Sequence, residues 1–377
     1  MKGNFEKLSI EIYGESHAPE IGVRLGGIPR GCRLTLANVD NLLARRKSVD
    51  GVWSTPRKEE DSPTIVAGLT KTDGGYVLDG DIDICIKNTN VRPNDYTNTL
   101  SIPRPSHADY AAYVKDGRIS SGGGRFSGRM TAPLCIAGGI AEELLESADI
   151  RICAYISSIG GVNGASYKTR KDVSLEGISE SDEKRIKQSN FPLLDESDGK
   201  ELQERIALAA RDGDSVGGTV ECIVTGLEAG MLGDALFEGL ESKIAYSVYG
   251  VPAVKGVEFG DGFELAGMNG SEANDRYKFS DDKIVTVTNR SGGVNGGISN
   301  GMPLTLRVAF RPTPSISKEQ RTADLDSGEM CWLKIKGRHD ACIVPRAVPC
   351  VESAVALALL DEILKLRDGI ELYGGKK

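Results

Sequence analysis

Histidine is scarce in this sequence, with only three among 377 residues: His17, His107 and His339. Each lies among Gly, Ser, Arg and Asp residues, a setting typical of binding loops. Because histidine titrates near neutral pH, the three residues suggest an acid–base site assembled from distant parts of the chain. The alternative for each is a structural histidine that hydrogen-bonds a glycine-rich turn.

Long apolar runs are also absent. No stretch approaches the length of a membrane span. The first 17 residues contain no hydrophobic core of the kind that a signal peptide requires. We therefore expect a cytoplasmic protein with no membrane partner.

Metal-binding cysteine motifs are missing as well. The eight cysteines form no CxxC pair and no other ligand spacing. They lie in apolar or strand-like runs, so we expect buried, reduced thiols and no metal site. They are Cys32, Cys85, Cys135, Cys153, Cys222, Cys331, Cys342 and Cys350.

The charge is acidic overall and uneven along the chain. A net charge of −8 without a basic arm argues against a nucleic-acid partner. Yet arginines gather near the histidines, among them Arg104, Arg129 and Arg346. Guanidinium groups bind carboxylates and phosphates in a bidentate manner, so this pattern indicates a small polyanionic ligand. The alternative is that these arginines are solvated or ion-paired.

The hydrophobic pattern predicts an α+β fold in one domain, residues 1–377, with an exposed insertion at 176–202. Strand-like runs occupy 21–28, 64–69, 82–86, 151–159, 219–226, 254–259, 284–288 and 304–310. Helical patterns cover 36–46, 133–148, 201–212, 236–248 and 351–368. The last helix is apolar on most of its circumference, so we expect it between layers.

A glycine-rich segment at 120–133 is the strongest candidate for an anion site. Its three consecutive glycines precede Arg125, Ser127 and Arg129 and lead into a helix. Exposed amides and guanidinium groups at a helix N-terminus suit a phosphate. The segment is not a Walker loop, because GxxxxGK[ST] is missing.

Two further segments are ambiguous. Residues 45–61 begin with two arginines at the end of a predicted helix. A helix end favours cations for structural reasons alone, and the alternative is that these arginines and the loop after them bind an anion. Residues 291–301 are rich in glycine and suit either the close approach of a ligand or a plain tight hairpin.

Taken together, the segments resemble the chorismate synthase family, in the same order along the chain. The residues that carry the resemblance are GESHAPEIGVRLGGIPRG (14–31), GGGRFSGRMTAPLCIAGGIA (122–141) and GRHDACIVPRAVPCVESAVA (337–356). The segments between them also match with the expected spacing, so the resemblance covers nearly the whole chain.

The resemblance implies a lyase of the shikimate pathway and of aromatic amino acid biosynthesis. The family converts 5-enolpyruvylshikimate 3-phosphate to chorismate by a 1,4-anti elimination of phosphate. It needs reduced FMN without net redox change, so an external flavin reductase or another source of reduced flavin is implied. The family fold is a helical layer between two mainly antiparallel sheets, and the family assembly is a homotetramer.

The resemblance also assigns roles to individual residues. His17 matches the histidine beside the flavin, His107 the proton donor to the departing phosphate, and Asp340 the carboxylate that removes the C6 proton. His339 is expected to be structural. Substrate-binding positions are Ser16, Arg46, Arg129 and Arg338, and cofactor-binding positions are Arg125, Phe126, Ser127, Ala253, Gly296, Arg311, Pro312, Thr313, Pro314, Ser315 and Arg338.

The sequence departs from the family pattern in the second motif. Phe126 occupies a position that is usually Ser, and Met130 one that is usually Glu. These changes leave two alternatives open. One is a non-catalytic or altered-specificity relative that binds flavin or an anionic metabolite. The other is an enzyme that also reduces FMN with NADPH, although the sequence has no nucleotide fingerprint.

Overall fold

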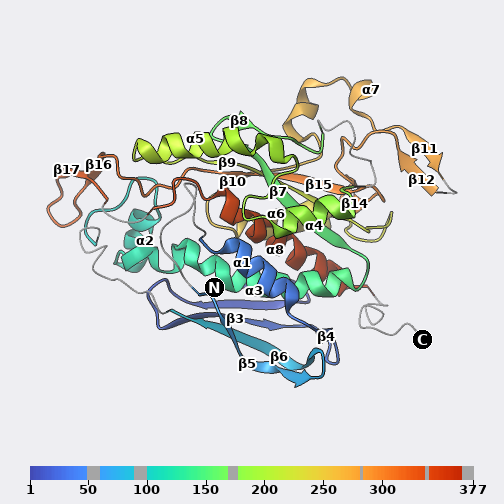
Figure 1. The fold of residues 1–377 in the computed structure, drawn as a ribbon, viewed down its shortest axis with the longest axis horizontal. Coiled ribbons are helices and arrows are strands. Elements are labelled where there is room, and N and C mark those ends of the chain that lie inside the picture. The colour runs from blue at the N-terminus through green and yellow to red at the C-terminus, as the bar shows by residue number, and fades with distance from the viewer. Residues whose placement is uncertain (49–59, 89–99, 169–176, 281–282, 336–338, 367–377) are drawn as a thin grey trace.

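The computed structural model describes residues 1–48, 60–88, 100–168, 177–280, 283–335 and 339–366. Within these ranges a layer of helices lies between two antiparallel sheets (Figure 1). This is the α+β sandwich that the resemblance implied. No helix in the described ranges has both the length and the apolar character needed to cross a membrane.

The first sheet comes from the N-terminal quarter of the chain and has the order β1-β2-β3-β6-β4, with β5 also paired to β6. Its inner face carries alternating apolar residues, which is why these segments form strands against the helical layer. The strands are β1 (Lys2–Asn4), β2 (Ser9–Gly14), β3 (Glu20–Gly26), β4 (Arg33–Leu34), β5 (Pro63–Thr72) and β6 (Gly75–Lys87).

The second sheet has the order β10-β15-β9-β7-β8. Its strands are β7 (Arg151–Ile159), β8 (Val162–Asn163), β9 (Gly218–Thr225), β10 (Val254–Phe259) and β15 (Leu304–Phe310). Every second residue of β15 is buried, as the alternation of its sequence predicts. The predicted bounds of β7, β10 and β15 are those of the structure.

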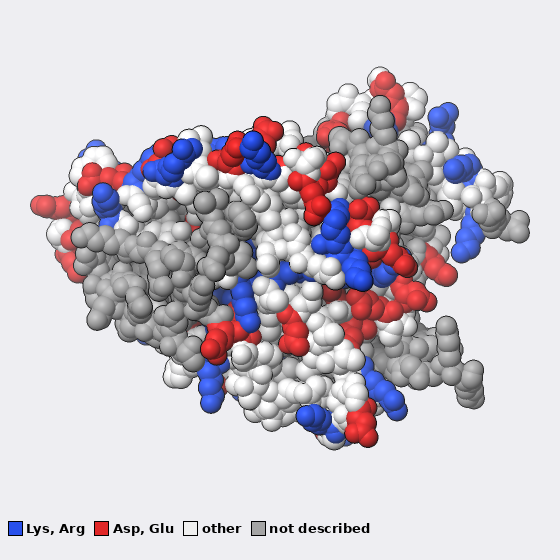
Figure 2. Space-filling view, viewed as in Figure 1, with Lys and Arg blue, Asp and Glu red and all other residues white. Residues whose placement is uncertain are grey.

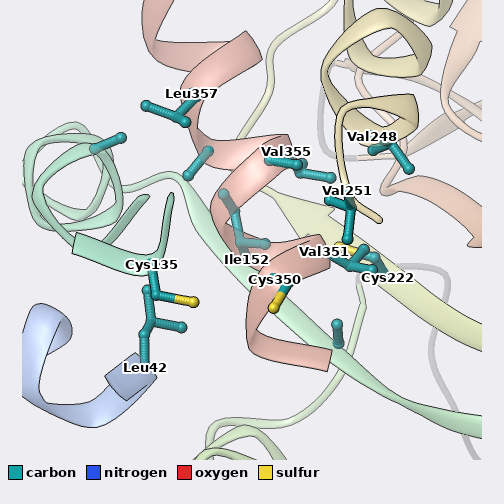
Figure 3. Packing of buried hydrophobic residues seen from close by; sticks show 14 of the residues in the cluster. Leu42, Cys135, Ile152, Cys222, Val248, Val251, Cys350, Val351, Val355 and Leu357 are labelled. Atoms are coloured by element: carbon teal, nitrogen blue, oxygen red, sulfur yellow. The ribbon is translucent and has the colours of Figure 1, made fainter. Parts of the chain in front are cut away.

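The helical layer consists mainly of α1 (Ala37–Arg46), α3 (Thr131–Glu146) and α8 (Val344–Ile363). In α8 only Arg346 is not fully buried, which confirms that this helix lies between layers. Gly138 of α3 packs directly on Ser353 of α8, and a Cβ at Gly138 would overlap that serine. Buried side chains from these helices and from both sheets form one core. Figure 3 shows the part of it where α1, α3 and α8 meet β7 and β9.

Shorter elements complete the fold. The helices are α2 (Asp109–Asp116), α4 (Glu180–Gln188), α5 (Gly199–Arg211), α6 (Leu240–Tyr249) and α7 (Gly270–Ala273). The 3₁₀ segments are η2 (Ser121–Phe126), η3 (Gly128–Met130), η4 (Glu196–Asp198), η5 (Leu236–Glu238) and η6 (Gly262–Gly267). Three small ladders pair β11 (Tyr277–Ser280) with β12 (Lys283–Thr286), β13 (Val294–Asn295) with β14 (Ile298–Ser299), and β16 (Gln320–Ala323) with β17 (Met330–Leu333).

The structure corrects three predictions. Of the predicted insertion 176–202, residues 177–202 are not an exposed insertion, because Ile186, Phe191 and Leu193 are buried and the exposed side chains are polar or charged. The thiol of Cys331 is half-buried, whereas the other seven cysteines are buried as predicted. The last helix begins at Val344 and not at 351.

Candidate active site

One cavity of about 430 Å³ brings together residues from six separate parts of the chain. It lies where the end of α1, the η2–η3 segment and the start of α8 meet the loops around 105, 252 and 313. The residues that line it are Arg46, Arg104, His107, Ala108, Gly122, Phe126, Ser127, Gly128, Arg129, Thr131, Val251, Pro252, Ala253, Arg311, Thr313, Pro314, Ser315, His339, Asp340, Ile343, Arg346, Ala347 and Cys350.

The wall of this cavity is strongly basic, because the described residues that line it include five arginines and one acid, Asp340. Arg46, Arg104 and Arg129 are at most 5% exposed, so their charge is directed inward. On the face drawn in Figure 2, basic and acidic side chains are interspersed and form no basic patch. The predicted concentration of positive charge lies on the wall of the cavity.

Three consecutive glycines allow η2 to pass between two histidines. Gly122, Gly123 and Gly124 all have positive φ, which disfavours any residue with a Cβ. A Cβ at Gly122 would overlap the ring of His17, and one at Gly123 would lie 3.1 Å from Cε1 of His107. The glycine run is thus the backbone spacer that holds both imidazoles against one loop.

His107 belongs to a compact ionic network. Its Nδ1 lies 2.6 Å from Oδ1 of Asp109. Arg104 donates from Nε to Oδ2 of Asp109 at 2.6 Å and from Nη2 to Oδ1 at 2.8 Å. Burial would raise the pKa of Asp109, but the hydrogen bonds from Arg104 and His107 outweigh it and hold that pKa well below its usual range.

A second buried network joins two arginines through one carboxylate. Arg46 Nη2 donates to Oδ2 of Asp61 at 2.6 Å, and Arg129 Nη1 donates to Oδ1. Burial would raise the pKa of Asp61, but the two guanidinium charges outweigh it and hold the pKa at about 2. Asp61 therefore stays ionised and neutralises one of the two charges, which leaves the cluster cationic.

Asp340 lies just before the first residue of α8. Its Oδ2 accepts a hydrogen bond from Arg346 Nη1 at 2.9 Å, and its backbone carbonyl accepts one from Thr313 Oγ1 at 2.8 Å. Arg346 also donates from Nε to the carbonyl of Arg46 at 2.9 Å. These bonds connect the loop at 313, the end of α1 and the start of α8.

His339 lines the cavity, although the sequence suggests a structural role. Its Nε2 is buried and has no hydrogen-bond partner among the residues that the structure describes. Burial and the nearby charge of Arg104 lower the pKa of His339, which favours a neutral ring. The imidazole therefore presents a polar atom at the cavity wall.

The sequence-predicted residues fall into four groups. The cavity contains His107, Asp340, Arg46, Arg129, Phe126, Ser127, Ala253, Arg311, Thr313, Pro314 and Ser315. His17 and Ser16 lie just behind the cavity. The ring of His17 is close to Gly122, and the backbone amide of Ser16 donates a hydrogen bond to the carbonyl of Gly124 at 3.3 Å. Arg338 lies outside the described residues.

Three predicted cofactor positions do not line the cavity. Gly296 lies in the exposed turn between β13 and β14. The segment 291–301 therefore contains a tight hairpin, which was one of the two structures that its sequence suggested. Arg125 points outward to Asp116 at 2.6 Å, with its guanidinium 4.8 Å from the ring centre of Phe126. Pro312 flanks the cavity residues Arg311 and Thr313 without lining it.

Sequence reasoning missed several residues of the site, among them Asp61, Asp109 and Cys350. Asp109 had a usable signal, because it follows His107 by two positions in the same motif. Asp61 had none, since its partners are 15 and 68 positions away. Cys350 lines the cavity and its sulfur donates to the carbonyl of Arg346 at 3.4 Å.

Comparisons with known proteins agree with one another. The sequence model of the chorismate synthase family matches residues 8–364. The chorismate synthase of Lancefieldella parvula is 42% identical over 94% of this chain and 94% of its own length. That of Pyrococcus abyssi is 42% identical over 95% of this chain and 96% of its own.

A solved structure shares the fold. It is described as a crystal structure of chorismate synthase, and it superposes with a TM-score of 0.72 over 96% of this chain and 93% of its own. At 22% identity this likeness supports the architecture alone.

Proposed function

Because this chain belongs to the chorismate synthase family, we propose that the arginine-lined cavity is its active site. The chain is a chorismate synthase, a lyase that eliminates phosphate from 5-enolpyruvylshikimate 3-phosphate to give chorismate. The proposed location of the active site rests on one observation: His107, Asp340 and five arginines line the same cavity.

The substrate carries two carboxylates and one phosphate, which suits a cationic cavity. We assign Arg46 and Arg129 to these anions, because both are buried and held in place by Asp61. Arg338 is assigned with them on the resemblance alone. Ser16 is 1% exposed, and its Oγ has no hydrogen-bond partner among the described residues, so it is available to a ligand that reaches behind Gly122.

The cavity also suits reduced FMN. Val251, Ile343 and Ala347 make part of its wall apolar, which matches a flat ring system, and Phe126 adds an aromatic side chain. The unpartnered Nε2 of His339 offers one hydrogen bond to the polar edge of such a ring. When bound, reduced FMN would supply electron density transiently without net oxidation.

The cofactor would be held by the residues that the resemblance assigns along the same walls. Those in the cavity are Phe126, Ser127, Ala253, Arg311, Thr313, Pro314 and Ser315. Arg311 is itself anchored, because its Nη1 donates to the carbonyl of Ser106 beside His107. Arg125, Pro312 and Gly296 lie outside this cavity, and Arg338 is outside the described residues.

Two residues of the chain would move protons in the elimination. Asp340 accepts the proton from C6 of the substrate, while the bond between C3 and the phosphate oxygen breaks. His107 donates a proton to the departing phosphate, which lowers the charge of the leaving group. His17, behind Gly122, would hold a proton beside the flavin.

The remaining proposals concern the oligomeric state, the cellular location and the source of reduced FMN. We propose a cytoplasmic homotetramer that receives reduced FMN from an external reductase, with NADPH used only by that partner. Exposed apolar side chains on β11 and β12, such as Phe279 at 82% and Tyr277 at 71%, suit burial between subunits. Light scattering would measure the mass of the assembly, and activity with oxidised FMN plus NADPH alone would contradict the external source.

An anaerobic assay tests the activity itself. Protein, 5-enolpyruvylshikimate 3-phosphate and chemically reduced FMN are mixed without oxygen, and chorismate and phosphate are measured. We expect both products in equal amounts, with turnover abolished in His107→Ala. Substrate binding without turnover would contradict the proposal and indicate a non-catalytic relative.

A further inference from the structure

Asp109 is placed to control the proton that His107 carries. Its carboxylate accepts four hydrogen bonds: from the backbone amide of Arg104 at 3.1 Å, from Arg104 Nε at 2.6 Å, from Arg104 Nη2 at 2.8 Å and from His107 Nδ1 at 2.6 Å. The Asp109 side chain is only 2% exposed. Water is therefore excluded, and the carboxylate has one orientation.

An ionised carboxylate can only accept hydrogen bonds. Nδ1 of His107 must therefore carry a proton to satisfy the bond at 2.6 Å. Nε2 is then the nitrogen that exchanges a proton with a ligand in the cavity that His107 lines. This is the arrangement that a proton donor to a phosphate requires.

Arg104 contacts both His107 and Asp109. Its Nη2 lies 3.0 Å from Nδ1 of His107, and both groups donate to the same oxygen of Asp109. The guanidinium therefore fixes the orientation of the carboxylate that faces Nδ1 of His107.

We propose that Asp109 is a positioning residue for the elimination, fixing the Nδ1-protonated form of His107 with Arg104 as its anchor. This rests on the proposed role of His107 as proton donor. A purely structural role is the alternative, because Asp109 also lies in the first turn of α2, where a carboxylate stabilises any helix.

Asp109→Asn separates the two roles. An asparagine at this position would direct its oxygen to the backbone amide and Nε of Arg104, because both can only donate, whereas Nδ1 of His107 on the other side can become an acceptor. Its NH₂ group would then face His107 Nδ1, which would become an acceptor. We expect the neutral ring to change tautomer, kcat to fall at least roughly 100-fold, and KM for the substrate to stay within about threefold.

The scarcity of histidine makes the tautomer measurable. Selective ¹⁵N labelling of the three histidines gives few imidazole signals, and His107→Gln identifies those of His107. In the wild type we expect a protonated Nδ1, with the Nε2 signal shifting when inorganic phosphate is added. Asp109→Asn should reverse the ring assignment, and Asp109→Glu, which restores the charge, should recover the Nδ1 signature and part of kcat.

Asp182→Asn is the matched control. Asp182 pairs with Arg185 at 3.0 Å on the surface of α4, and its removal should change neither kcat nor the histidine signals. If Asp109→Asn does not fold, Arg104→Lys tests the same point, because it keeps the charge but loses the two-pronged anchor. A folded Asp109→Asn with wild-type kcat or an unchanged His107 tautomer would overturn the proposal. An active His107→Gln would instead overturn the role of His107 and leave the tautomer result standing.

Discussion

Nη2 of Arg46 lies 2.6 Å from Oδ2 of Asp61, and both side chains are at most 3% exposed. The other oxygen of Asp61 accepts a hydrogen bond from Arg129. One carboxylate therefore positions two arginines that the proposed mechanism uses to bind an anionic substrate. This relationship links the stability of the protein to the chemistry of its cavity.

Removing the charge of Asp61 should destabilise the fold. Asp61→Asn leaves two buried guanidinium groups without their counter-ion, so we expect the free energy of unfolding to fall by about 3–5 kcal/mol. Denaturant unfolding measures this difference. Asp182→Asn, in a partly exposed pair with Arg185, should cost at most about 1 kcal/mol. Equal losses in the two variants would contradict the role of Asp61.

The same carboxylate predicts a dependence of stability on pH. The pKa of Asp61 is lowered from 3.8 to about 2, so its contribution is fully present above pH 4 and is lost as the pH falls through about 2. A shift of this size corresponds to about 2 kcal/mol. Unfolding curves between pH 2 and 5 should show a smaller decline in Asp61→Asn than in the wild type. Parallel declines would show that the carboxylate is not stabilised in the fold.

Gly123 should tolerate no side chain. Its φ of +85° disfavours alanine, and the new Cβ would lie 3.1 Å from the ring of His107. We expect Gly123→Ala to lower stability by about 1–3 kcal/mol and to lower kcat, since the imidazole must move. Gly80→Ala is the control, because a Cβ there has no neighbour within 4 Å. A variant with wild-type kcat would contradict the placement of His107 against this loop.

Phe126 should contribute to cofactor affinity. It is 42% exposed at the cavity, where a flat ring can cover it. We expect Phe126→Ala to weaken FMN binding about 2- to 10-fold, the range for one aromatic contact. Quenching of flavin fluorescence gives the affinity. Phe263→Ala, on the surface at 84% exposure, is the matched control, and an equal effect there would argue against a specific contact.

Much of the fold could be predicted because its strands have strong local patterns. The alternation in β15 and the continuous apolar run of β7 identify both strands with their correct bounds. The start of α8 could not be predicted from its composition. Pro345 and Pro349 read as helix breakers, yet Pro345 fits the first turn and Pro349 is buried inside the helix, where packing outweighs the lost hydrogen bond.

The site could be predicted only where one motif contains the contact. His107 and the glycine run each lie in a recognisable segment, and the structure places them together. Asp61 contacts Arg129 across 68 positions, a pairing that only the folded chain creates. Gly296 was assigned by the resemblance to the family, and in the structure it lies in the turn that closes the hairpin of β13 and β14.

A crystal structure with 5-enolpyruvylshikimate 3-phosphate and oxidised FMN tests the central claim most directly, because it shows where both ligands bind. We expect the phosphate within about 3 Å of Nε2 of His107 and C6 facing the carboxylate of Asp340. The substrate carboxylates should contact Arg46 or Arg129. A substrate bound outside this cavity, or one whose phosphate points away from His107, would contradict the account.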